Sequence, residues 1–494
     1  MSFGHMRYTI AVMLLLITAL SAGKIADEER TKQAIVKIYT VSKTPNYLEP
    51  WSSTMRRSSG SGAIIPGHRI LTNAHVVANH TFIEVQRYGD RKRYIARVLS
   101  VSHQADLALL GVEDEEFFFG IEPLTLGDLP KIEQEVVVYG YPMGGSTLSA
   151  TTGVVSRIEH QRYAHSGEYF LSIQVDAAVN PGNSGGPAIS DGKIVGVVMQ
   201  SLRKSQNIGY LVPVNMIRHF LDDIADGRYD GFGRFGLALQ NMENPAMRRY
   251  FHLDDDTTGN LISHIVYNSS ANGILKEGDI ILSIDGNKVE NDGTVAFRKH
   301  EYTSLIYMLD KHQIGDTVTF EIMRDRKRMK VKATLKQIAD DMILVKTTRY
   351  DTMPRYFIYG GYVFSPLTRN LLAMAGSNRT DLYSYLLRRP SKEKKEVVVL
   401  LKVLASDISR GNYDITLWPV EKINGEKFDT FDTFYKKMFS SKKEFIILEN
   451  ERGVKLILDR NESMKKQNEI LQRYNIEFDR SSDLRKEKKI ESGD

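Results

Sequence analysis

Residues 180–187 read Asn-Pro-Gly-Asn-Ser-Gly-Gly-Pro, and the fold expected for the chain rests on this segment. A serine flanked by glycines on a tight turn can present its hydroxyl oxygen to a substrate. Such a turn also lets the N–H groups of Gly182 and Ser184 point into one small space, as an oxyanion hole requires. A side chain on the glycines would close that space or forbid the turn. Taken by itself, the octamer is also compatible with a glycine-rich hairpin turn.

A serine nucleophile needs a base that takes its proton, because the hydroxyl is a poor nucleophile at neutral pH. His75, in Leu-Thr-Asn-Ala-His-Val-Val (71–77), is the one among twelve histidines that lies in an apolar and sterically constrained setting. His68, His80 and His103 lie in more polar contexts and are interpreted as surface groups. Because a histidine beside apolar residues is usually structural, the assignment of a base requires a matching acid.

Asp106 supplies that acid at the head of the apolar run Asp-Leu-Ala-Leu-Leu (106–110). A buried carboxylate is costly without a partner, and the Nδ1–H group of His75 would be its partner. The alternative is an ordinary aspartate at a strand edge. The order His75, Asp106, Ser184 is that of chymotrypsin and differs from the orders in subtilisin and the α/β-hydrolases. We therefore predict a catalytic triad, with its first two members in one barrel and Ser184 in a second.

The chain around these motifs has the pattern of a mainly β protein. From Gln33 to Pro213, short β-forming runs alternate with Gly, Pro, Asn and Ser, which is typical of a sandwich or barrel. Residues 47–61 are polar and are expected to form a long flexible loop; such a loop, or residues 160–168, could gate the site. An amphipathic helix is expected over 214–225, and glycines after it mark a linker.

Composition excludes several kinds of site. The chain has 494 residues and no cysteine, so a disulfide, a thiolate metal site and a cysteine nucleophile are excluded. The net charge is +5 and the basic residues are scattered among acids, which does not favour nucleic acid as a partner. No cofactor or metal is expected.

Residues 1–23 have a basic start, an apolar middle and small residues at the end, as in a signal peptide. An uncleaved anchor and a buried first helix are the alternatives. No later segment is apolar enough to cross a membrane.

Two smaller units follow the β-rich region. The first, from residue 235 to 338, mixes strands with a helix expected around residues 302–311. The second carries strand patterns, a helix at 431–439 and a strand pair at 444–459. Both end with a helix and a β-hairpin, which suggests a diverged internal repeat. Beyond Glu462 the chain is rich in charge and is expected to be helical at first and then to fray.

The motifs together resemble the HtrA/Deg (DegP-like) family of PDZ-containing serine proteases. The resemblance is carried by residues 72–76, 106–110, 182–186 and Asn-Ile-Gly-Tyr-Leu-Val-Pro at 207–213. It implies a chymotrypsin/trypsin-like double β-barrel protease domain followed by two PDZ-like α+β domains. The last unit resembles the divergent second PDZ domain of the plant-type subgroup, through residues 360–367 and 420–425. Plant-type relatives are not typically exported, so the signal peptide is a departure from their pattern.

The resemblance, together with the patterns above, gives the expected boundaries. They are a signal peptide at 1–23, a protease domain at 28–226, PDZ domain 1 at 232–340, a PDZ-like domain 2 at 345–462 and a charged tail at 463–494.

Two binding sites are also expected. Ala178 stands where a trypsin-like pocket would carry an aspartate. By the family's pattern, Val179 and Leu202 line the S1 pocket, so cleavage after small or medium apolar residues is expected. Residues Phe235, Gly236 and Leu237 resemble the loop with which a PDZ domain binds a peptide carboxylate. In the last unit Pro366 removes one N–H donor near the equivalent loop, so poor peptide binding and a role in assembly are expected there.

The function expected is ATP-independent proteolysis of misfolded exported proteins, a quality-control and stress-response role in the periplasm or another extracytoplasmic compartment. The partners would be unfolded proteins, peptide C-termini at PDZ domain 1 and further copies of the chain in trimer-based oligomers. The alternative is a non-proteolytic chaperone or PDZ scaffold whose triad is gated and normally inactive.

Overall fold

The computed structural model describes residues 27–143, 145, 147–201, 208–337 and 342–486. The chain forms two compact units. The first is built from residues up to 42 and from 57 to 337, and the second from residues 43–56 and from 338 onward. Among the described residues, no helix has both the length and the apolar character needed to cross a membrane. The signal peptide expected at 1–23 lies outside the described residues.

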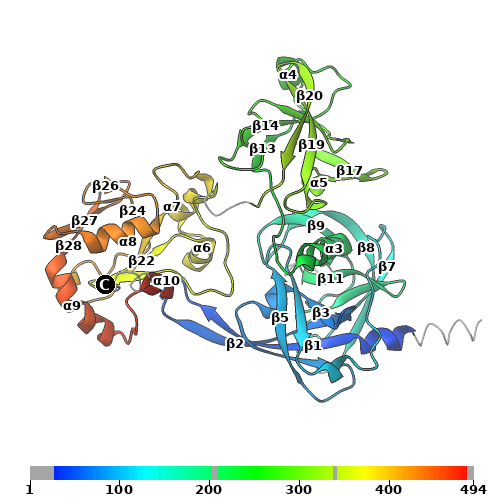
Figure 1. The fold of residues 1–494 in the computed structure, drawn as a ribbon, viewed down its shortest axis with the longest axis horizontal. Helices are drawn as coiled ribbons and strands as arrows, with labels where there is room; N and C mark the ends of the chain where they lie inside the picture. The colour runs from blue at the N-terminus through cyan, green and yellow to red at the C-terminus, as the bar shows by residue number, and fades with distance from the viewer. Residues whose placement is uncertain (1–26, 144, 146, 202–207, 338–341, 487–494) are drawn as a thin grey trace, which may run out of the picture. The chain divides into compact units, whose positions relative to one another are not determined.

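The first barrel of the first unit closes in the strand order β1-β2-β3-β6-β5-β4. Figure 1 labels β1, β2, β3 and β5 of this barrel. Its strands are β1 (Ile35–Pro45), β2 (Ser53–Ile65), β3 (Arg69–Thr72), β4 (His80–Arg87), β5 (Tyr94–Ser102) and β6 (Leu107–Val112). The flexible loop expected at 47–61 is therefore wrong for most of its length, because β2 begins at Ser53. The outer half of β2 is exposed, and its polar composition reflects contact with solvent in an extended strand.

The second barrel closes in the order β10-β11-β12-β9-β8-β7. Its strands are β7 (Glu135–Gly140), β8 (Ser149–Arg162), β9 (Tyr169–Val175), β10 (Pro187–Ser190), β11 (Lys193–Ser201) and β12 (Gly209–Pro213). Helix α3 (Val214–Asp223) follows and packs Met216, Ile217 and Phe220 into the apolar core shared by the barrels. The loop expected at 160–168 is shorter than predicted, because β8 continues to Arg162.

The first unit ends in a six-stranded sheet, with five strands in the order β13-β14-β15-β19-β20 and β16 paired with β15. The helix expected at 302–311 is present only as α5, because residues 302–304 belong to strand β18. This segment has to turn after the β17–β18 hairpin, which leaves room for one helical turn. The elements are β13 (Leu237–Gln240), α4 (Pro245–Tyr250), β14 (Asn260–Ile265), β15 (Ile280–Ile284), β16 (Asn287–Lys288), β17 (Thr294–Arg298), β18 (Glu301–Ser304), α5 (Tyr307–Asp310), β19 (Thr317–Arg324) and β20 (Lys327–Thr334).

This sheet domain is joined to the second barrel by buried polar contacts. Asp310, at the end of α5, accepts from His160 of β8 at 3.1 Å and from Arg234 at 2.9 Å. Arg298 of β17 donates to the carbonyl oxygens of Leu129 and Pro130 at 2.7 and 2.8 Å. A buried carboxylate held by two cationic or hydrogen-bonding partners is the arrangement that offsets its desolvation.

The second unit contains two four-stranded sheets, ordered β21-β22-β23-β24 and β26-β25-β27-β28. Its elements are β21 (Phe357–Tyr359), β22 (Tyr362–Pro366), α6 (Arg369–Ala375), α7 (Thr380–Tyr383), β23 (Val398–Val403), β24 (Trp418–Val420), β25 (Lys422–Ile423), β26 (Glu426–Lys427), α8 (Phe431–Ser440), β27 (Phe445–Glu449), β28 (Lys455–Asp459), α9 (Arg460–Arg473) and α10 (Ser482–Lys486).

The segment expected to be a charged tail is folded over its described part. Helix α9 begins at the Asp459 cap and buries Ile470 and Leu471, and α10 buries Leu484. These apolar residues belong to the two cores of the unit. They are few and are separated by many charged residues, which is why composition alone suggested a frayed end.

The insert of residues 43–56 between β1 and β2 also belongs to the second unit. Tyr47 is 7% exposed within an apolar core that includes Leu344 and Tyr356. Trp51 packs edge-on against Tyr356, with ring centroids 6.0 Å apart. Glu49 accepts from Lys402 at 2.8 Å. The insert therefore forms an apolar knob in a core that is otherwise built from residues more than 280 positions later.

Candidate active site

His75 and Asp106 form a close pair in the first barrel. His75 lies in the short helix α2 (Ala74–Val77), which follows β3 directly. Its Nδ1 is 2.7 Å from Asp106 Oδ2, and its backbone N–H donates to Oδ1 at 2.9 Å. Asp106 is buried, has a left-handed backbone (φ +55°), and its carbonyl accepts from the Asn73 side chain at 2.8 Å. Both carboxylate oxygens therefore bind His75, one through its ring and one through its backbone, and can fix the imidazole ring.

The ionisation of the pair is coupled. Burial lowers the pKa of His75, but the charge and the hydrogen bond of Asp106 outweigh it and raise the pKa above its ordinary 6.5. Burial raises the pKa of Asp106, and the charge and hydrogen bond of His75 outweigh that effect and lower it below 3.8. The pair therefore favours an imidazolium beside a carboxylate, the state that a base reaches after taking a proton.

The Ser184 turn packs against the segment that leads to His75. Gly185 has φ +83°, and a Cβ atom there would lie 2.1 Å from Thr72 Oγ1 and 2.2 Å from the Ser61 carbonyl oxygen. Ser61 N–H donates to the Ser184 carbonyl at 2.8 Å. Glycine thus allows the turn to approach β2 and β3 closely. Within the described ranges, no hydrogen bond joins Ser184 Oγ to His75.

The turn before Ser184 has the form that an oxyanion hole needs. Gly182 has φ +101°, and a Cβ atom there would lie 2.4 Å from the Tyr141 carbonyl oxygen. Its own carbonyl accepts from Ser61 Oγ at 2.8 Å. As far as the described residues go, the N–H groups of Gly182 and Ser184 donate to no protein acceptor. Two backbone donors are therefore available beside the serine.

Three family models match the chain. They describe a trypsin-like peptidase domain at residues 60–197 and PDZ domains at 233–335 and 345–483. "Putative protease Do-like 3, mitochondrial" of Arabidopsis thaliana is 38% identical, over 94% of this chain and 83% of the relative. "Protease Do-like 2, chloroplastic" of the same plant is 37% identical, over 91% of this chain and 75% of the relative. This chain belongs to the Do-like (HtrA/Deg) family of serine proteases.

As a member of the HtrA/Deg family, the chain is a serine endopeptidase. The "Serine protease DegP homolog" of Plasmodium falciparum is 31% identical, over 77% of this chain and 55% of that protein. In fold, the chain is similar to the "HtrA-type protease AlgWS227A with decapeptide", with a TM-score of 0.51 over 63% of this chain and 96% of the other, at 22% identity. The expectations of a mainly β protein, a trypsin-like protease domain and two PDZ domains are confirmed.

Of the two residues expected to line the S1 pocket, the structure describes Val179 and not Leu202. Val179 is partly buried and lies against β12, where a Cβ atom on Gly209 would be 2.4 Å from Val179 Cγ2. Leu202 lies outside the described residues. Of the two, only Val179 is available as a structural basis for specificity.

The expected carboxylate loop of the first PDZ domain lies beside a free sheet edge. Phe235 is buried and packs edge-on against Phe320, with ring centroids 4.9 Å apart. Gly236 has φ +70°, and its carbonyl accepts from Val266 N–H at 2.8 Å. Leu237 begins β13, which is the edge strand of its sheet. An edge strand next to such a loop can accept a peptide as an added strand.

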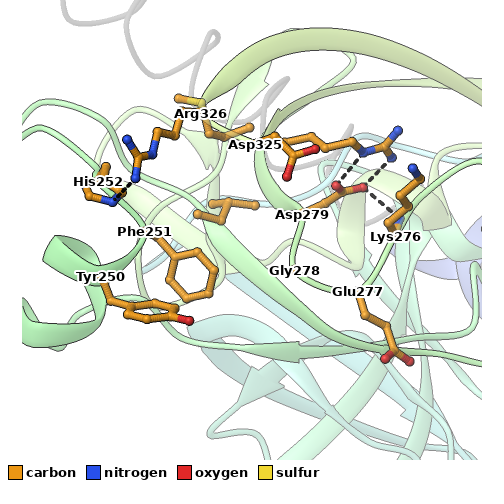
Figure 2. Close-up of a pocket in the computed structure, with 12 residues that line it drawn as sticks. Tyr250, Phe251, His252, Lys276, Glu277, Gly278, Asp279, Asp325 and Arg326 are labelled. Atoms are coloured by element: carbon orange, nitrogen blue, oxygen red, sulfur yellow. Dashed lines mark hydrogen bonds and ion pairs between the residues drawn. The ribbon is translucent and has the colours of Figure 1, made fainter.

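A separate cavity of about 440 Å³ lies elsewhere on this PDZ domain, lined by residues of α4, the turn before β15 and the β19–β20 hairpin (Figure 2). Its buried charge is already neutralised, since Asp279 accepts from Arg324 at 2.6 and 2.7 Å. Arg326 and His252 are joined to each other across its rim. None of Phe235, Gly236 and Leu237 lines it, so it is distinct from the expected peptide groove.

In the second PDZ domain, the strand with the residues expected to form the equivalent loop has partners on both sides among the described residues. Its strand β22, which carries Pro366, is paired with β21 on one side and β23 on the other. The hairpin between β21 and β22 turns at Gly360 and Gly361, both with positive φ. Strand β22 is therefore not available for pairing with an added peptide strand.

Sequence reasoning missed two histidines that the fold brings to the site. His103, interpreted as a surface group, lies in the turn between β5 and β6, with its Nδ1 3.0 Å from Nε2 of His165. The His165 ring lies 6.1 Å from the His75 ring, centroid to centroid. His165 belongs to the second barrel, and no sequence pattern links it to His103. The three-residue spacing of His103 from Asp106 was the one available signal.

Proposed function

We propose that His75, Asp106 and Ser184 are the catalytic triad of this HtrA/Deg endopeptidase. The observation that carries the proposal is the buried Asp106 carboxylate, 2.7 Å from His75 Nδ1, in a barrel packed against the Ser184 turn. Ser184 Oγ attacks the substrate carbonyl while His75 Nε2 takes its proton. His75 then gives that proton to the leaving amine, and a water activated in the same way releases the acyl group.

The N–H groups of Gly182 and Ser184 hold the oxyanion that forms in each step. Their support is the positive φ of Gly182 and the lack of a competing acceptor among the described residues. Binding of substrate brings Ser184 Oγ into hydrogen-bond range of His75, because catalytic hydrogen bonds often tighten only in the substrate complex.

The proposed substrates are misfolded or damaged proteins, cleaved after small or medium apolar residues. Ala178 provides no counter-charge for Lys or Arg, and Val179 offers an aliphatic wall. Apolar side chains are buried in folded proteins and exposed in damaged ones, so this pocket would select unfolded chains. Such cleavage would serve protein quality control under stress.

The first PDZ domain would bind peptide C-termini through the loop of Phe235, Gly236 and Leu237. The second would bind them poorly, since β21 covers the edge of β22. It would contribute to homo-oligomers, built from trimers. A cleaved N-terminal segment would direct the protein out of its compartment of synthesis. The sequence favours the periplasm, whereas the names of the plant relatives point to organelles. N-terminal sequencing of the mature protein from fractionated cells distinguishes these destinations.

The decisive experiment compares the wild-type chain with Ser184→Ala on unfolded casein, with the cleavage sites mapped by mass spectrometry. The proposal expects turnover by the wild type alone and cuts mainly after Val, Ala or Ile. Cuts mainly after Lys or Arg contradict the specificity. A wild type as inactive as Ser184→Ala at every temperature favours the gated chaperone or scaffold, for which the missing bond between Ser184 and His75 is the supporting observation.

A further inference from the structure

His103 and His165 form a hydrogen-bonded pair beside the proposed triad, brought together from different barrels. Their facing nitrogens are 3.0 Å apart and their ring centroids 5.2 Å apart. Two imidazoles at this distance hold a proton between them, since one nitrogen must donate and the other accept. Because His165 also lies 6.1 Å from His75, the three rings form a continuous row.

Both ends of the pair are fixed by the fold. Tyr163 is fully buried beneath the His165 turn, and its hydroxyl donates to the Leu171 carbonyl at 2.6 Å. The turn is closed by Tyr163 N–H to Glu168 O and Gly167 N–H to Tyr163 O, both 2.8 Å. On the other side, Ser102 Oγ accepts from Ala105 N–H and bonds to Tyr229, which holds the turn that carries His103. The row is therefore built into the barrels.

We propose that His165 is a positioning residue for the catalytic base, acting with His103 as a coupled imidazole pair that sets the pH at which His75 takes a proton. This inference rests on the proposed role of His75 and extends it. A proton on the pair places a positive charge close to His75, and a second positive charge on His75 is then disfavoured. His75 stays neutral, and able to act as a base, to a lower pH than it would alone.

The surroundings of His165 support this electrostatic coupling. Among the described residues, the titratable or charged groups around it include His75 from α2, His103 and Asp106 from the turn between β5 and β6, and Tyr163, Arg162 and Glu168 from its own turn. Asp106 is the buried anion of the group. Burial raises its pKa, and the charges of His75 and then His165 lower it, so His165 acts on the same carboxylate as the base.

The test is the pH profile of kcat/KM on a fluorogenic peptide with an apolar residue before the scissile bond. His165→Gln removes the competing charge, so the acid midpoint should move up by about half a pH unit or more. His165→Arg makes the charge permanent, so the midpoint should move down by a similar amount. His68→Gln is the control, because His68 is an exposed histidine paired with Glu115, and its midpoint should equal that of the wild type.

A second readout does not depend on turnover. In the Ser184→Ala protein, the low-field proton resonance of His75 Nδ1–H can be titrated with and without His165→Gln, and its midpoint should show the same upward move. Unmoved midpoints in both His165 variants, or moves in one common direction, overturn the proposal. A wild type that is inactive at all pH values defeats the proposed catalysis, and the resonance titration still decides the role of His165.

Discussion

His160 Nε2 lies 3.1 Å from a carboxylate oxygen of Asp310, and both side chains are buried where the first PDZ domain joins the second barrel. Arg234 binds the other carboxylate oxygen at 2.9 Å, so one anion serves two partners from different segments. The stability of the first unit should therefore depend on a single side chain of α5.

Asp310→Ala is expected to destabilise the first unit by about 3 to 5 kcal/mol, because it leaves the partly buried Arg234 and the buried His160 ring without their shared carboxylate. Denaturant unfolding, followed by circular dichroism, measures the loss in the free energy of unfolding. Asp316→Ala is a suitable control, since Asp316 lies on the same domain with half of its side chain exposed. Equal effects of the two substitutions would contradict the importance of the buried network.

Asp106→Asn should lower kcat by roughly 10⁴-fold with little change in KM, because the amide cannot hold the Nδ1–H tautomer or stabilise the imidazolium. Steady-state kinetics on a peptide substrate measure this loss. Asp128→Asn is the matched control at a fully exposed carboxylate and should keep full activity. A loss below tenfold at Asp106 would mean that another group orients His75.

As the pH rises through the pKa of His75, activity should increase and the stability contributed by the His75–Asp106 pair should decrease. Its pKa is raised above 6.5, so kcat/KM should rise with pH through a midpoint above that value, as the base becomes neutral. The His75–Asp106 ion pair gives its full stability below 6.5 and loses it as pH rises through the raised pKa. Paired kinetic and thermal unfolding measurements should show activity gained over the window where this contribution declines. The control is the double variant Ser184→Ala, His75→Gln, which lacks the ion pair. Compared with Ser184→Ala alone, it should not lose this stability as the pH rises.

Gly185→Ala should destabilise the protease domain by about 3 to 5 kcal/mol and abolish turnover, because the new Cβ atom would meet Thr72 Oγ1 at 2.1 Å. Gly192→Ala is a matched control. Gly192 also has positive φ, +72°, but a Cβ atom there meets nothing within 4 Å. It should cost about 1 to 2 kcal/mol and leave activity intact. Chemical denaturation of both variants isolates the cost of the close approach.

Tyr47→Ala should destabilise the second unit by about 3 to 5 kcal/mol, as truncation of a buried aromatic ring does. Calorimetry should show the transition of that unit moving to lower temperature. Tyr413→Ala, at a ring that is 52% exposed, should leave the transition in place. A transition that did not move on Tyr47→Ala would show that the knob is dispensable.

The architecture was predictable because short motifs carry strong local constraints. The glycines around Ser184 and the apolar run after Asp106 can each be recognised within one segment. The His103–His165 pair could not be predicted, because it depends on two loops from different barrels meeting in space. The strand β2 was mistaken for a loop because its polar residues face solvent. The role of the insert between β1 and β2 was missed because the residues that it packs against are far away in the sequence.

The Tyr47 knob limits how the chain can be shortened. A protein that ended at Gln337 would keep Tyr47, Leu48 and Trp51 but would lose the core that covers them. Such a fragment would carry three bare apolar side chains and should self-associate, so its behaviour would misrepresent the intact enzyme. A chain cut only between residues 337 and 342 would still have its two pieces held together without a covalent bond, because the knob remains seated in its core.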